Sequence, residues 1–100
     1  MKFSRTSQED TVVVQIEGEL DAFSAPELRP LLDSLAAERV RKVVVDLTEL
    51  RLIDSSGVGA IVSLFKRVRA NEGELRIRGL RGQPLAIFKL LNLERVFPIE

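Results

Sequence analysis

Residues 43–68 read VVVDLTELRLIDSSGVGAIVSLFKRV, and their hydrophobic rhythm changes at Asp54. Residues 43–47 form a short, continuous apolar run, which predicts a central strand covered on both faces. From Val58 onward the apolar residues recur every three or four positions, which predicts a helix with one buried face. Residues 48–53 either extend the strand or connect it to the helix. This strand-to-helix junction is typical of an α/β domain.

The sequence before this stretch predicts a hairpin. Residues 11–17 are β-branched and mostly apolar, and Gly18 ends the expected strand. Residues 3–8 predict an earlier edge strand. Because only a tight turn at residues 9–10 separates the two runs, we expect the strands to pair antiparallel.

The next segment predicts a helix with an irregular start. Its leucines are spaced as on one helix face, at positions 28, 31, 32 and 35. Ser24 and Glu27 fit a capping box. A proline at position 30 would break a helix interior, so we expect the regular helix to begin near Pro30 after a looser turn.

Beyond the second helix, Gly73 fits a left-handed cap, and residues 74–78 alternate as expected for a strand near the sheet edge. Pro84 opens a last helix with Asn92 as its C-cap, and residues 93–99 close with a short strand.

The order of elements predicts one α/β domain over residues 1–100. We expect a mixed sheet of four to five strands with helices packed against it.

Composition excludes several kinds of chemistry. The 100 residues carry a formal net charge of zero and contain no His and no Cys. A Ser-His-Asp triad, a Cys nucleophile, a thiolate cluster and an imidazole-ligated zinc are therefore impossible. We expect no enzyme activity, no cofactor and no metal.

The candidate site is the run Asp54-Ser55-Ser56-Gly57 at the strand-to-helix junction. Backbone N–H groups are unpaired at a helix start, and the helix dipole favours negative charge there. A plain helix cap by Asp54 or one of the serines explains the same residues. A Walker loop is excluded because no Lys follows Gly57, and a hydrolase nucleophile elbow is excluded because its glycine pattern is missing.

Four segments of the chain resemble those of a known family. They are Gly18-Glu19-Leu20-Asp21, the apolar central strand, Ile53–Gly59 and Leu91–Ile99. Together they resemble, in the expected order, the signature segments of bacterial anti-sigma factor antagonists, which are STAS domains. The resemblance covers nearly the whole chain.

The resemblance implies a protein switch. Such an antagonist binds an ATP-dependent anti-sigma factor kinase and frees the sigma factor, the kinase phosphorylates the first Ser after the Asp, and a phosphatase reverses the reaction. Carried onto this chain, the phosphorylated residue is Ser55. The expected partner-binding residues are Asp21, Phe23, Ser24, Asp54, Ser55, Ser56 and Gly57. Phe23 has a second interpretation, as a hydrophobic staple for the helix that follows it.

Other functions share these residues. STAS domains also serve as unphosphorylated scaffold subunits, in stressosomes or beside transporters, and a small-ligand module at the helix N-termini is a third class. Basic residues at 66–69 and 76–81 raise a nucleic-acid alternative, but acidic residues interrupt them and solvated faces explain them better. We expect a cytoplasmic protein that contacts neither nucleic acid nor membrane. A weak homodimer is compatible with this interpretation.

Overall fold

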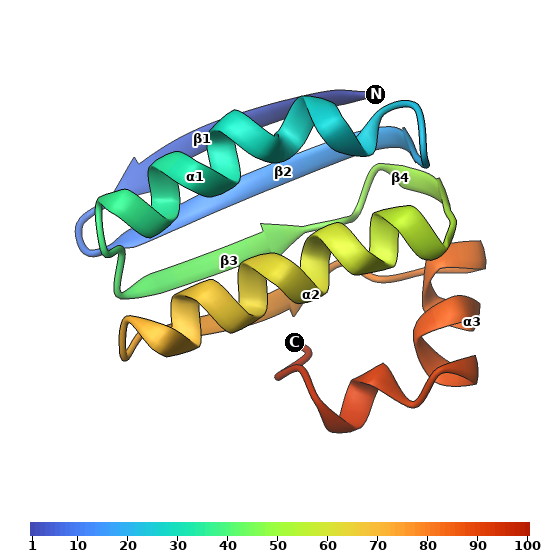
Figure 1. The fold of residues 1–100 in the computed structure, drawn as a ribbon. Helices are drawn as coiled ribbons and strands as arrows, with labels where there is room; N and C mark the ends of the chain where they lie inside the picture. Colours follow the sequence, from blue (N-terminus) through green and yellow to red (C-terminus); the bar gives the residue numbers. More distant parts are fainter.

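A computed structural model describes residues 1–100 as a mixed five-stranded sheet with helices packed against it (Figure 1). The strands lie in the order β1-β2-β3-β5, and β4 pairs with β2 outside this row. β1 and β2 are antiparallel, whereas the other pairings are parallel. The expected fold class is confirmed. In chain order the elements are β1 Lys2–Gln8, β2 Thr11–Leu20, the 3-10 helix η1 Ala25–Leu28, α1 Arg29–Ala37, β3 Lys42–Asp46, β4 Leu50–Ile53, α2 Ser55–Ala70, β5 Glu74–Arg78, α3 Gly82–Leu90 and the 3-10 helix η2 Leu93–Arg95.

The N-terminal hairpin forms as predicted. β1 pairs with β2 from Lys2 opposite Glu17 to Gln8 opposite Thr11. Glu9 takes the left-handed conformation, with φ 58°, which closes the connection between the strands. β1 has no partner on its other side, so it is the edge strand that the sequence predicts.

β2 continues past Gly18, so the prediction that the strand ends there is wrong. Gly18 has φ 90°, a conformation open to glycine, and the pairing register shifts between Gly18 and Glu19. Before this irregularity β2 pairs with β3, and from Gly18 onward it pairs with β4. The shift places the end of β2 beside the end of β4, where Leu20 faces Ile53.

The first helix begins as expected from its proline. η1 covers Ala25–Leu28, and α1 then starts at Arg29 with Pro30 in its first turn. The missing N–H of a proline costs nothing at that position because the first N–H groups of a helix have no partner within it. The prediction of a capping box is wrong, because the side chain of Ser24 makes no hydrogen bond to the helix.

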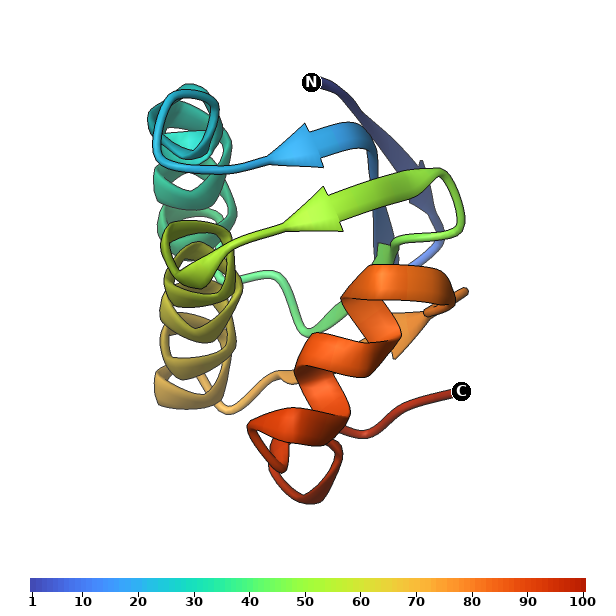
Figure 2. The same ribbon diagram turned by 90° about the vertical axis from the view of Figure 1, so that its right-hand side faces the viewer.

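The hydrophobic core lies between the sheet and one layer of helices. α1 and α2 run side by side over the same face of the sheet (Figures 1 and 2). Val43 and Val45 of β3 are buried beneath them, whereas Val44, which points the other way, is only half-buried. The central strand is therefore covered fully on one face, and the prediction of cover on both faces is wrong.

The end of α2 corrects the expected role of a glycine. Glu72, with φ 62°, takes the left-handed position that the sequence assigns to Gly73. A Cβ atom on Gly73 would lie 2.9 Å from the carbonyl oxygens of Val40 and Arg41. A glycine stands at position 73 because two backbones approach closely there.

The C-terminal part adds the strand β5 to the sheet and packs α3 against β4. β5 matches the predicted strand, and Asn92 adopts the left-handed conformation after α3, with φ 56°. The expected closing strand is reduced to η2 and one bridge between Ile77 and Ile99. The centre of the Phe97 ring lies 4.8 Å from that of Phe65 and 5.8 Å from that of Phe88, so this segment packs against α2 and α3. No helix of the fold combines the length and the apolar character needed to cross a membrane.

Removal of the Phe88 ring tests this packing. Phe88 is fully buried, so Phe88→Ala leaves a cavity and should lower the free energy of unfolding by about 3–5 kcal/mol in urea titrations followed by circular dichroism. Leu90→Ala is the matched control on the same helix, because Leu90 is 75% exposed and its loss should cost less than about 0.5 kcal/mol. Equal losses for the two variants would contradict the burial of Phe88.

Candidate functional site

The candidate site lies where β2 and β4 end side by side. The N–H of Asp54 donates to the carbonyl of Leu20 at 3.2 Å, so the chain leaving β4 is bonded to the chain leaving β2. Residues 21–24 follow the first strand, and α2 follows the second. Two segments far apart in sequence thus share one edge of the molecule (Figure 2).

Asp54 caps α2 and also joins the two segments. Its Oδ1 accepts a hydrogen bond from the N–H of Gly57 at 3.0 Å, which is the helix cap expected from the residue type. Its Oδ2 accepts from the N–H of Ala22 at 3.2 Å. One carboxylate therefore satisfies an unpaired donor of the helix and holds the 21–24 loop against it.

Ser55 and Ser56 are the first two residues of α2, and both are exposed. The capping bond is made by Asp54, so it does not occupy either hydroxyl. Their positions at a helix start favour negative charge through the helix dipole, by about 0.3–1 kcal/mol when exposed. The site therefore presents free serine hydroxyls on a rigid element.

Gly57 permits the close approach of α2 to β2. A Cβ atom at this position would lie 2.5 Å from the carbonyl oxygen of Leu20 and 2.7 Å from the Cγ1 of Ile53. No rotamer relieves a clash with a backbone oxygen, so a larger residue must displace the helix. Gly59, by contrast, has nothing within 4 Å of its ideal Cβ.

The loop before α1 is organised around Asp21 and Ser24. Asp21 Oδ1 accepts hydrogen bonds from the N–H groups of Phe23 and Ser24, each at 2.9 Å. The Ser24 hydroxyl is buried, accepts from the N–H of Asp21 at 2.9 Å and lies at the same distance from the Glu19 carbonyl. Hydrogen bonds, chiefly from the Ser24 N–H, lower the pKa of Asp21. Ser24 thus holds the loop together from inside, and Asp21 forms its half-exposed outer side.

The structure leaves Phe23 on the surface. Its side chain is 92% exposed, so it does not pack as a staple on the following helix. Leu52 of β4, which the sequence reasoning did not select, is also exposed, at 47%. Phe23 follows β2 and Leu52 belongs to β4, so both apolar side chains belong to the segments that form the site. Together they offer hydrophobic contact area on the two segments that form the site.

A shallow pocket between these segments was also missed. It has a volume of about 230 Å³, and its lining residues include Leu52, Gln83 and the acidic residues Glu19, Asp21 and Asp54. The Gln83 amide accepts from the Ile53 N–H at 2.9 Å and donates to the Ile53 carbonyl at 3.0 Å, as a neighbouring strand would. No local sequence pattern indicates this role of Gln83, because only the fold places it next to the backbone of Ile53.

The predicted site residues therefore fall into three groups. Phe23, Ser55 and Ser56 are exposed, Asp21 and Asp54 form the hydrogen bonds that organise the site, and Ser24 and Gly57 lie buried beneath it. No three or more acidic side chains converge closely enough to hold a metal ion. The arrangement can present a hydroxyl, two carboxylates and apolar surface to another molecule.

Two glycines of one helix give a matched test of this geometry. Gly57→Ala should lower the free energy of unfolding by about 1–3 kcal/mol, because its Cβ meets the Leu20 carbonyl. Gly59→Ala has open space around it and should stabilise the protein by about 0.5–1 kcal/mol through higher helix propensity. Urea titrations of both variants measure the difference. A Gly57→Ala protein as stable as wild type would contradict the close approach.

The lowered pKa of Asp21 predicts a dependence of stability on pH. The ionised carboxylate stabilises the fold above the ordinary pKa of 3.8, and this contribution is lost as the pH falls through the lower pKa of the folded state. Asp21→Asn should therefore be less stable than wild type at about pH 6, and the difference should shrink between about pH 4 and pH 2. Urea titrations across this range test the trend, and a difference independent of pH would contradict it.

Comparison with known proteins places this geometry in a family. The STAS domain model matches residues 2–100. The anti-sigma-B factor antagonist of Listeria monocytogenes is 30% identical over 91 residues, which are 91% of this chain and 80% of the relative. The Staphylococcus aureus protein of the same name is 29% identical over 94 residues, or 94% of this chain and 87% of the relative.

Solved structures share the fold at lower identity. An anti-sigma factor antagonist from Mycobacterium paratuberculosis superposes with a TM-score of 0.88 at 19% identity, over 98% of this chain and 83% of that one. The Bacillus cell fate determinant SpoIIAA in its phosphorylated form has a TM-score of 0.78 at 20% identity, over 99% of this chain and 91% of that one. With the family model matched across nearly its whole length, this chain belongs to the STAS domain family.

Proposed function

We propose that this STAS domain is an anti-sigma factor antagonist, which binds an anti-sigma factor kinase in the cytoplasm and is switched by phosphorylation of Ser55. The observation that carries the proposal is the position of Ser55, exposed at the start of α2 beside a loop held in place by Asp54. The names of the Listeria and Staphylococcus relatives support the same function. The SpoIIAA structures, solved with and without phosphate, share the fold.

The chain lends itself to being a substrate. It contains no His and no Cys, which excludes catalysis through an imidazole or a thiolate, and in this proposal the kinase supplies the ATP and the catalytic groups. The domain has to present one hydroxyl on a rigid element, and Ser55 is the first residue of a sixteen-residue helix. A phosphatase then removes the phosphate from the same exposed position.

Phosphorylation would alter binding without unfolding the domain. A phosphoserine adds about −1.5 to −2 charges at neutral pH, and the N-terminus of α2 tolerates negative charge. The same phosphate lies next to Asp54 in sequence, and Asp21 belongs to the adjoining loop. The concentrated negative charge and added bulk would obstruct close docking of a partner that fits the unmodified serine.

The partner surface combines polar and apolar contacts. Phe23 and Leu52 are the exposed apolar residues of the two segments, and exposed aromatic side chains are frequent anchors in protein interfaces. Asp21 and Ser24 would act through the shape of the loop, because their hydrogen bonds hold it. Ser56 and Gly57 would set the spacing between Ser55 and that loop.

Five of the six basic residues that raise the nucleic-acid alternative, all except Lys66, interact with other residues of the chain, which supports a protein partner instead. Arg69 lies 5.5 Å from the centre of the Phe65 ring. Four others form ion pairs: Arg67 with Asp33, Arg76 with Glu74, Arg78 with Asp46 and Arg81 with Glu49. Their pairing leaves no unbroken basic stripe to follow a phosphate backbone.

Phosphate mapping tests the proposal. Incubation with the cognate anti-sigma factor kinase and ATP, followed by mass spectrometry, should place phosphate on Ser55 of the wild-type protein. Ser55→Ala should remain unmodified, and the neighbouring Ser56→Ala should be labelled like wild type. Phosphorylated protein should bind the kinase at least about tenfold more weakly, equivalent to about 1.4 kcal/mol. Labelling of another residue, or none with a kinase that binds, would refute the switch.

A further inference from the structure

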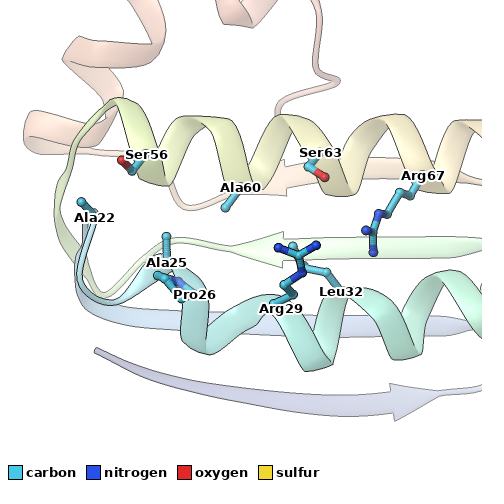
Figure 3. A pocket seen from close by; sticks show the side chains of 9 residues that line it. All are labelled: Ala22, Ala25, Pro26, Arg29, Leu32, Ser56, Ala60, Ser63 and Arg67. Carbon is cyan, nitrogen blue, oxygen red and sulfur yellow. The ribbon is translucent and has the colours of Figure 1, made fainter.

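A groove between α1 and α2 begins at the candidate site and extends beyond it. It has a volume of about 400 Å³ and opens between η1–α1 on one side and α2 on the other (Figure 3). Alanine and serine side chains make up much of its wall. Its lining is Ala22, Ala25, Pro26, Arg29, Leu32, Ser56, Ala60, Ser63 and Arg67.

The groove is positively charged. Arg29 on α1 and Arg67 on α2 both extend into the space between the helices (Figure 3). No acidic side chain lines the groove. Arg67 is paired with Asp33 at 2.5 Å, whereas Arg29 takes part in none of the ion pairs of the structure. The Arg29 guanidinium is therefore available to a carboxylate from outside the chain.

The groove is continuous with the candidate site. Ala22 lines the groove, and its N–H donates to Asp54. Ser56 lines the groove as well and directly follows Ser55. A protein that covers Ser55 therefore lies next to one end of the groove.

We propose that this groove binds an acidic segment of the same protein that docks at Ser55. The proposal rests on the proposed function and names a second contact of that partner. A guanidinium forms paired, directional hydrogen bonds with a carboxylate, which favours Glu or Asp side chains as the bound groups. The small residues of the wall let the segment approach, and Arg29, which is in no ion pair, recognises its carboxylates.

This contact would fix the orientation of the partner. The site carries the carboxylates of Asp21 and Asp54, whereas the groove carries Arg29 and Arg67. A partner with basic groups facing the first and acidic groups facing the second can dock in one direction only. A phosphate on Ser55 would stand next to the groove-lining Ser56 and would repel the bound acidic segment, which gives the switch a physical basis.

Charge reversal at Arg29 tests the proposal. Binding of the cognate kinase is measured by isothermal titration calorimetry for wild type, Arg29→Glu and Lys66→Glu at low and high salt. Lys66→Glu is the matched control, because Lys66 is exposed on α2 outside the groove and the substitution changes the net charge equally. Arg29→Glu should weaken binding at least about tenfold and flatten its salt dependence. Lys66→Glu should bind within about twofold of wild type.

The outcomes separate the two proposals. If the kinase binds wild type and Arg29→Glu equally, or if Lys66→Glu is weakened as much, the groove proposal is overturned and the proposed function stands. If wild type neither binds the kinase nor is phosphorylated, both are overturned. The groove proposal also fails if millimolar ATP or inorganic phosphate shifts the Ser63 and Arg67 amides in NMR spectra and displaces the kinase. A loss of self-association in Arg29→Glu would overturn it in favour of a second copy of the chain.

Discussion

The contact between the first turn of α2 and the end of β2 determines most of what this domain presents. Gly57 approaches the Leu20 carbonyl so closely that a Cβ atom would stand 2.5 Å from it. This proximity lets the Asp54 carboxylate reach both the Gly57 and the Ala22 N–H groups. The loop and the helix start therefore form one surface, and Ser55 stands on it with a free hydroxyl.

That surface suits a protein whose chemistry is performed by a partner. The hydrogen bonds of Asp21 and the buried Gly57 fix the shape of the site, whereas the two serines and Phe23 are exposed to solvent. The phosphorylation of Ser55 that we propose would change the charge of this surface at a hydroxyl that takes no part in the hydrogen bonds of Asp54 and Asp21. The neighbouring groove adds opposite charge, so recognition in our proposals depends on a local pattern of charge on a molecule whose net charge is zero.

Much of the fold could be predicted because it depends on local pattern. β-Branched residues and a short turn predicted the hairpin, and a continuous apolar run predicted the central strand. Hydrophobic periodicity predicted α2 and β5, and Pro30 predicted the late start of α1. The errors concern residues whose partners are distant in sequence. The Ser24 hydroxyl bonds with Glu19 and Asp21 and does not cap the helix. Gly73 is required because the backbone of residues 40–41, just before β3, approaches it closely. Val44 is only half-buried because the helices pack on the other face of its strand.

The sequence by itself determined the order of elements, the exclusion of His and Cys chemistry, and the Asp-Ser-Ser-Gly run at a helix start, because these depend on residue identity and short-range spacing. Only the tertiary structure decided that Asp54 holds the 21–24 loop, that Gln83 binds the edge of β4, and that Arg29 and Arg67 share a groove. Each of these joins residues thirty or more positions apart. The pairing of β2 with β4 and the packing of α1 beside α2 bring such residues together, and neither contact can be predicted from a local sequence pattern.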